Sequence, residues 1–134
     1  MLTELREVSR RWWELAEHAN RADLETSITA IVDVYRRHAA AFTAAVETAT
    51  YDTSVAEELR MLVQEIIDAT HTAIERGQTA GTIRDVATAE PPAVLTWMVE
   101  RAGYQLVRGT NPSNDPKIVA VLTDIIWTTL YRMP

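Results

Sequence analysis

The sequence predicts an all-α protein, a bundle of five to six helices. Apolar residues recur at spacings of three and four along most of the chain, which is the period of an amphipathic helix. Only four glycines occur in 134 residues, and the alternation of β-branched residues that marks strands is absent. The C-terminal third is apolar on more than one face, as expected for helices that are buried on most sides.

Length and composition indicate one ordinary globular domain. A chain of 134 residues buries about two thirds of its unfolded surface. Without cysteine there is no disulfide framework, thiolate metal site or cysteine nucleophile. No apolar run approaches the roughly 20 residues of a membrane span and no signal peptide opens the chain, so a cytoplasmic location is expected. A net charge of −6 disfavours nucleic-acid binding by this domain, because phosphate neutralisation needs clustered Lys and Arg.

The first two helices are expected at residues 2–19 and 24–48. In the first, Trp12 and Trp13 are adjacent and cannot share a face, so one belongs to the core and the other covers a neighbouring element or a partner. Asp23 is the expected N-cap of the second helix. Its apolar stripe includes Ile28 and Tyr35.

The third helix is expected at residues 54–76, where Ser54 and Glu57 form a capping-box pattern. Gly77 and Gly81 are expected to end it. After a loop over residues 81–90, a fourth helix is expected from Pro91, since proline suits the first helical turn. Gly109 is expected to stop that helix.

The fifth helix is expected at residues 115–131, with Asp115 as N-cap and Pro116 at the first helical position. Its polar residues fall on one strip and its apolar residues on two others, so a second element must cover the second apolar strip. Another copy of the same chain is the simplest cover, and a central position in a monomeric bundle is the alternative. The two apolar strips are Ile118, Val121, Leu122 and Ile125, and Val119, Ile126, Trp127 and Leu130.

Motifs for catalysis are missing from the sequence. His18, His38 and His71 fall on three different segments, none at the spacing of a helical metal site, and no nucleophile elbow, P-loop or dinucleotide-binding motif occurs. We therefore expect no catalytic residue, no metal and no cofactor. Large aromatics accompanied by small residues can interlock in a core, or they can frame an apolar cavity for a small molecule.

Four stretches resemble the C-terminal domain of TetR-family transcriptional regulators, and among these the EthR-type repressors of actinobacteria. They are ITAIVDVYRRHAAAF, AIERGQTAGTIRD, VLTWMVERAGYQLVRG with its Glu-Arg pair, and VLTDIIWTTLYRMP. The resemblance implies a homodimer formed through the last two helices and a small hydrophobic effector that controls DNA binding allosterically. It places residue 1 within the helix that would connect to an N-terminal helix-turn-helix domain, and no such domain is recognised here.

The resemblance also implies site residues. Thr96 and Val99 fall where EthR has two pocket asparagines, so its ligand class is not carried over, and hydrophobic or aromatic molecules with one acceptor are expected instead. The pocket positions are Leu24, Ile28, Ile31, Tyr35, Leu59, Ile66, Thr70, Thr96, Val99, Tyr104 and Trp127. The expected dimer interface is Leu95, Met98, Ala102, Leu106, Ile118, Leu122 and Ile125.

Two other functions are left open by the sequence. One is a ligand-free helical homodimer that acts as a protein-interaction module, and the other is an enzyme with an unrecognised site.

Overall fold

A computed structural model describes residues 2–15, 20–85, 91–107 and 110–131. It contains α1 (Leu2–Leu15), α2 (Arg21–Arg37), α3 (Ala39–Ala49), α4 (Thr53–Ala80), α5 (Pro91–Ala102) and α6 (Asp115–Leu130). A π-helical turn, η1 (Gly103–Val107), follows α5, and a 3-10 turn, η2 (Pro112–Asn114), precedes α6. The all-α prediction is confirmed.

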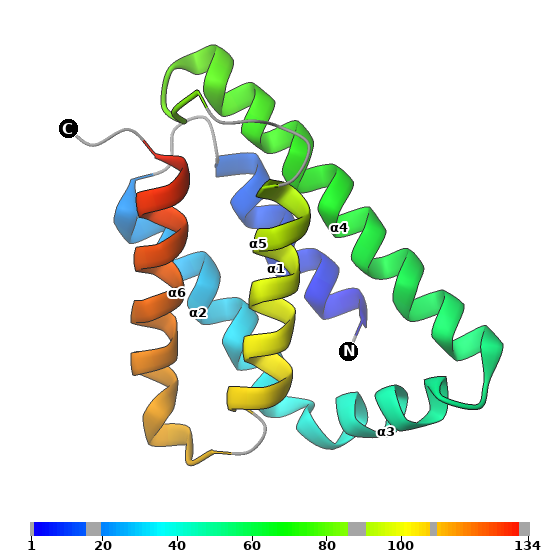
Figure 1. The fold of residues 1–134 in the computed structure, drawn as a ribbon. Helices are drawn as coiled ribbons and strands as arrows, with labels where there is room; N and C mark the ends of the chain where they lie inside the picture. The colour runs from blue at the N-terminus through cyan, green and yellow to red at the C-terminus, as the bar shows by residue number, and fades with distance from the viewer. Residues whose placement is uncertain (1, 16–19, 86–90, 108–109, 132–134) are drawn as a thin grey trace.

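The helices form a bundle around α2, which packs mainly against α1 and α6. Figure 1 shows α5 and α6 side by side at the front, α1 and α2 behind them, and α4 running diagonally along one side, with α3 closing the lower edge. The long α4 packs against α1, α3 and α5, and contacts α2 far less. This arrangement leaves space between α2 and α4 inside the bundle.

The expected second helix is in fact two helices. His38 leaves helical geometry at φ −111° and ψ 26°, so α2 ends there and α3 turns away toward α4. The break is anchored on α1, where Glu4 pairs with both Arg37, at 3.0 Å, and the His38 ring. Hydrogen bonds from Arg37 and then His38 lower the pKa of Glu4. The apolar stripe in the sequence continues through the break, so it gave no sign of these long-range ion pairs.

Several helix ends differ from the sequence expectation. Asn20, not Asp23, caps α2, and Asp23 completes a capping box with it. Asp52 caps α4 by accepting hydrogen bonds from the Ser54 and Val55 amides, so the Ser54–Glu57 pattern lies inside the helix. The expectation failed because an acceptor just upstream took the capping role.

Gly77 and Gly81 have different structural roles. Gly81 ends α4 with a left-handed φ of 84°, as expected. Gly77 lies within α4, where a Cβ would come within 2.4 Å of the Ile83 side chain. Ile83 is fully buried and pairs with Tyr131, while the Arg84 amide donates to the Leu130 carbonyl at 2.7 Å. The segment after α4 is thereby fastened to the end of α6.

The start of α6 is set by an ion pair rather than by the expected cap. Asp115 is the first residue of the helix, and its carboxylate accepts two hydrogen bonds from Arg36 of α2, at 2.6 and 3.0 Å. A third Arg36 N–H donates to the Thr110 carbonyl at 2.8 Å. This bidentate pair, about four-fifths buried on each side, fixes α6 against α2.

The fourth helix is shorter than expected, because regular α geometry ends at Ala102 and the chain widens into η1. Gly103 permits this turn to approach α2, since a Cβ there would lie 2.6 Å from the Tyr35 ring. Gly109, expected to stop the helix, and His18 lie outside the described residues.

Thr123 supplies a test of the packing of α6. Its side chain is 2% exposed and its hydroxyl has no hydrogen-bond partner among the described residues, whereas the Thr70 hydroxyl accepts from the Trp13 indole at 3.2 Å. We expect Thr123→Val to leave the free energy of unfolding unchanged or raise it by about 1 kcal/mol, because it removes an unpaired polar group. The matched change Thr70→Val should lower it by about 1 kcal/mol, since it orphans a donor. Urea denaturation of both variants measures this, and equal effects would contradict it.

Candidate ligand cavity

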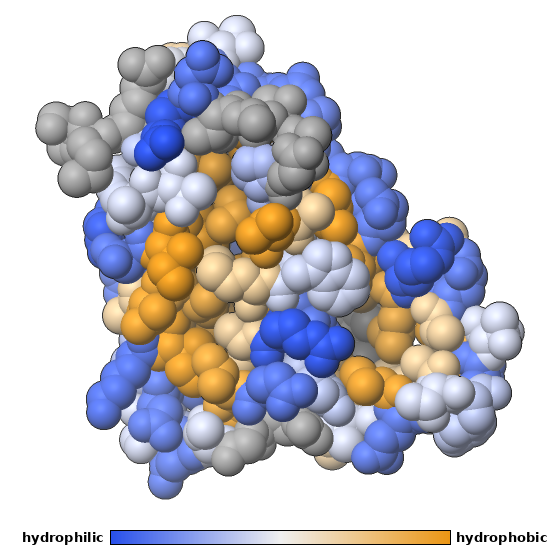
Figure 2. Space-filling model, in the orientation of Figure 1, coloured by the Kyte–Doolittle hydropathy of each residue, from blue (hydrophilic) through white to orange (hydrophobic). Residues whose placement is uncertain are grey.

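The bundle encloses a cavity of about 350 Å³ between α2 and α4. Its lining comes from all six helices, chiefly α2, α4 and α5, and is mostly aliphatic and aromatic. Figure 2 shows apolar side chains gathered over α5 and α6 and a hollow between α5 and the lower part of α4. The exposed liners Arg60, Trp97 and Arg101 place the mouth of the cavity between α4 and α5.

Each helix supplies its wall through the helical repeat. Leu24, Ile28, Ile31 and Tyr35 follow the 3–4 spacing and present one face of α2 to the cavity. From α4, the lining includes Leu59, Leu62, Val63, Ile66 and Thr70. Tyr35 stacks on Phe42 of α3 with ring centroids 4.4 Å apart, so these two aromatics pair along the wall and do not fill the space.

The structure brings together nine of the eleven expected pocket residues. Those that line the cavity are Leu24, Ile28, Ile31, Tyr35, Leu59, Ile66, Thr70, Thr96 and Val99. Trp127 and Tyr104 are not in the lining. The Trp127 ring stacks on Tyr131 with centroids 4.5 Å apart, and Tyr104 is buried with the Arg101 guanidinium 5.8 Å from its ring centroid. Trp127 and Tyr131 stand four residues apart and share one face of the helix, so the spacing in the sequence was the available signal for this stack.

Sequence reasoning missed the contribution of α1. Leu5, Ser9 and Trp13 line the cavity at a spacing of four residues, and the Trp13 indole reaches α4 through its hydrogen bond to Thr70. Arg76 of α4 also donates to the Trp13 carbonyl at 2.9 Å. The adjacent tryptophans were the available signal, and Trp13 is the one that spans to a neighbouring helix.

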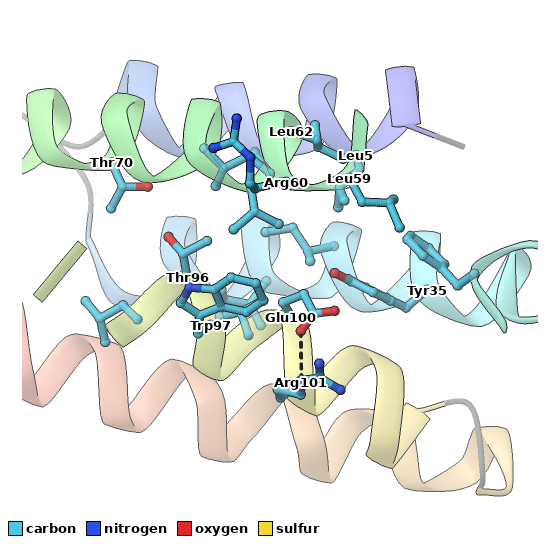
Figure 3. Close-up of a pocket in the computed structure, with 18 of the residues that line it drawn as sticks. Leu5, Tyr35, Leu59, Arg60, Leu62, Thr70, Thr96, Trp97, Glu100 and Arg101 are labelled. Atoms are coloured by element: carbon cyan, nitrogen blue, oxygen red, sulfur yellow. Dashed lines mark ion pairs between the residues drawn. The ribbon is translucent and has the colours of Figure 1, made fainter. Parts of the chain in front are cut away.

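The charged group Glu100 was also missed as a pocket residue. It lines the cavity from α5, and burial raises its pKa, while nearby Arg101 opposes that shift. Burial also raises the pKa of Tyr35, and the negative charge of Glu100 adds to the effect. In Figure 3 the Tyr35 hydroxyl and the Glu100 carboxylate point to the same end of the cavity. A charge in the middle of the apolar stretch VLTWMVERAGYQLV was the signal in the sequence.

The expected interface residues divide into two groups. Leu106 and Ile125 are exposed, and Met98 and Ile118 are half-buried. Leu95, Ala102 and Leu122 are buried within the protomer, and Leu95 lines the cavity. These three side chains belong to the buried core cluster of the protomer, which helical spacing on α5 and α6 did not reveal. Val94 and Val121 are the additional exposed apolar residues of this face.

The described ranges contain no group of three or more His, Asp or Glu side chains that could hold a metal ion. No helix among the described residues is long and apolar enough to cross a membrane.

The six helices and the cavity between them define an all-α domain with a space large enough for a small molecule. A family model described as "Transcriptional regulator EthR, C-terminal domain" matches residues 24–132, so the chain belongs to that family. The resemblance inferred from the four sequence stretches is confirmed. Neither the curated proteins nor the solved structures contain a match to the chain.

Gly103 gives a test of the cavity wall. We expect Gly103→Ala to lower the free energy of unfolding by about 1–3 kcal/mol, because its Cβ would overlap the Tyr35 ring and force it from its place. In a Tyr35→Leu background the same change should have a much smaller effect, since the aromatic ring is gone. Urea denaturation of the four proteins in this cycle measures the coupling, and additive effects would contradict the proposed contact.

Proposed function

We propose that this chain is the effector-binding and dimerisation domain of a transcriptional regulator, and that a small hydrophobic molecule occupies the cavity between α2 and α4. The observation that carries the proposal is the cavity itself. Its volume of about 350 Å³ falls within the usual range of small-molecule sites, and its lining is apolar with a few polar groups. Membership of a transcriptional-regulator family supports a regulatory role rather than a catalytic one.

The position of α1 suggests how binding is transmitted. This helix lines the cavity and is tied to α4 through the Trp13–Thr70 and Arg76–Trp13 hydrogen bonds. An effector that fits only one spacing of α1 and α4 would favour that conformation of the pair. By the family resemblance, α1 is the helix that connects to the DNA-binding domain, so its displacement would change the spacing of two such domains in a dimer.

Dimerisation is proposed through the outer face of α5 and α6. Six apolar side chains lie there, either exposed or half-buried, and would be covered by the same face of a second copy. This surface leaves out the three expected interface residues that lie inside the protomer. The proposed interface consists of Val94, Met98, Leu106, Ile118, Val121 and Ile125.

A substitution that fills the cavity should weaken ligand binding without unfolding the protein. Thr96→Trp places a bulky side chain at a cavity-lining position, whereas Thr72→Trp adds the same group to an exposed site on α4. We expect the first variant to weaken binding of 1-decanol by at least about tenfold and the second to leave it unchanged. A thermal-shift titration, with tryptophan fluorescence as a second readout, measures this. Equal binding by both variants would place the ligand elsewhere.

The interface can be tested with matched surface charges. Val121 on α6 and Met61 on α4 are 58% and 59% exposed, so a glutamate at either position is tolerated by the protomer. We expect Val121→Glu to raise the dimer dissociation constant by roughly tenfold or more, because it buries a charge between the two copies. Met61→Glu should leave the dimer intact. Sedimentation equilibrium distinguishes these outcomes, and a monomeric wild-type chain at micromolar concentration would contradict the dimer proposal.

A further inference from the structure

One end of the cavity carries a carboxylate without adequate partners. Glu100 lies on α5, and its Oε2 atom is shielded from solvent and accepts no hydrogen bond among the described residues. Arg101 Nε lies 3.3 Å from this oxygen, close enough for an ion pair but not aligned for a hydrogen bond. The Arg101 side chain is itself mostly exposed to solvent. A buried acceptor in this condition destabilises the empty protein.

The neighbouring side chains do not supply the missing hydrogen bond to Glu100 Oε2. Arg60, the other cation of the lining, forms its ion pair with Glu57 on α4. Burial raises the pKa of Tyr35, so its hydroxyl stays protonated, but it donates no hydrogen bond to Glu100 Oε2. Figure 3 shows the two side chains in the same part of the cavity. Most other lining residues are apolar, Ile31 and Val99 among them. Among the described residues, Glu100 Oε2 therefore has an ion pair with Arg101 but accepts no hydrogen bond.

We propose that the natural effector is an amphipathic molecule with an N–H donor or protonated amine at one end, and that the Glu100 carboxylate accepts from that group while the apolar part fills the cavity. This inference rests on the proposed effector-binding function. It names the chemical class of the ligand and the residue that selects it.

The size and charge of the cavity support this class. One water molecule occupies about 30 Å³ in the liquid, so a volume of about 350 Å³ corresponds to roughly a dozen groups of that size. A carboxylic acid would bring a second negative charge next to Glu100, and an ether or ketone would bring only an acceptor. The donor proposed here differs from the expectation from the sequence, in which Thr96 and Val99 suggested hydrophobic or aromatic molecules with one acceptor.

Three probes of equal chain length separate the possibilities: decylamine, 1-decanol and decanoic acid. Each is titrated by calorimetry, below its micelle concentration, into the wild-type chain and into Glu100→Gln. Wild type should bind decylamine at one site per protomer with roughly tenfold or greater preference over 1-decanol, because hydrogen bonds to a charged group are worth about 1.5–3 kcal/mol. Decanoic acid should bind more weakly than 1-decanol. Glu100→Gln should lose the preference for the amine and retain binding of the alcohol.

The control for general attraction of an amine to an acidic protein is Glu58→Gln, an exposed carboxylate on α4. It removes the same charge and should leave the decylamine preference intact. If wild type binds 1-decanol and decylamine equally, or if Glu100→Gln retains the preference, the inference about Glu100 is overturned while the effector-binding function stands. If wild type binds none of the three probes, the cavity is not a site for this class of molecule and both proposals fail. Glu100→Leu, checked by circular dichroism for folding, serves as a second variant with the same expected loss.

Discussion

The burial of α2 on two sides is the constraint on which the rest of the structure depends. One row of its side chains faces the cavity, while others, such as Val32 and Val34, are buried in the core, and the helix packs against both α1 and α6. The bidentate Arg36–Asp115 pair then fixes the start of α6 against the end of α2. With α2 held from both directions, the other helices are arranged around it, and the cavity opens on the side where α4 does not pack closely.

The cavity persists because α4 is supported elsewhere. At 28 residues, α4 extends for about 42 Å, long enough to rest on α1 and α5 and to meet α3 at its first turns. The aromatic side chains that could have closed the gap are engaged with each other, as Tyr35 is with Phe42. The close approach of η1 at Gly103 holds the Tyr35 ring against the wall. Large and small residues thus frame a space instead of interlocking.

The polar chemistry of the cavity is concentrated at two places. Thr70 is satisfied by the Trp13 indole and serves to link α1 with α4. Glu100 is left without a hydrogen bond to Oε2 at the other end, next to Tyr35. Thr70 has a hydrogen-bond partner, whereas Glu100 Oε2 has an ion pair with the exposed Arg101 but no hydrogen bond among the described residues. For this reason we assign the transmission of ligand binding to the link between α1 and α4, and the selection of the ligand to Glu100.

The helical class could be predicted from the sequence, because the spacing of apolar residues reports which side of a helix is buried. The family and the pocket positions on α2 and α4 came from the resemblance of four sequence stretches. Apolar spacing does not distinguish burial in the protomer from burial against a partner, so it could not show that Leu95 and Leu122 are buried within the protomer. The break at His38, which pairs with Glu4 of α1, and the lack of a hydrogen bond to Glu100 Oε2 emerged only in the folded protein, since each depends on how separate helices meet. The stack of Trp127 on Tyr131 is a local contact between residues four apart, which the sequence could have shown. The spacing of apolar residues describes one helix at a time, whereas a cavity forms where several helices do not pack closely against one another.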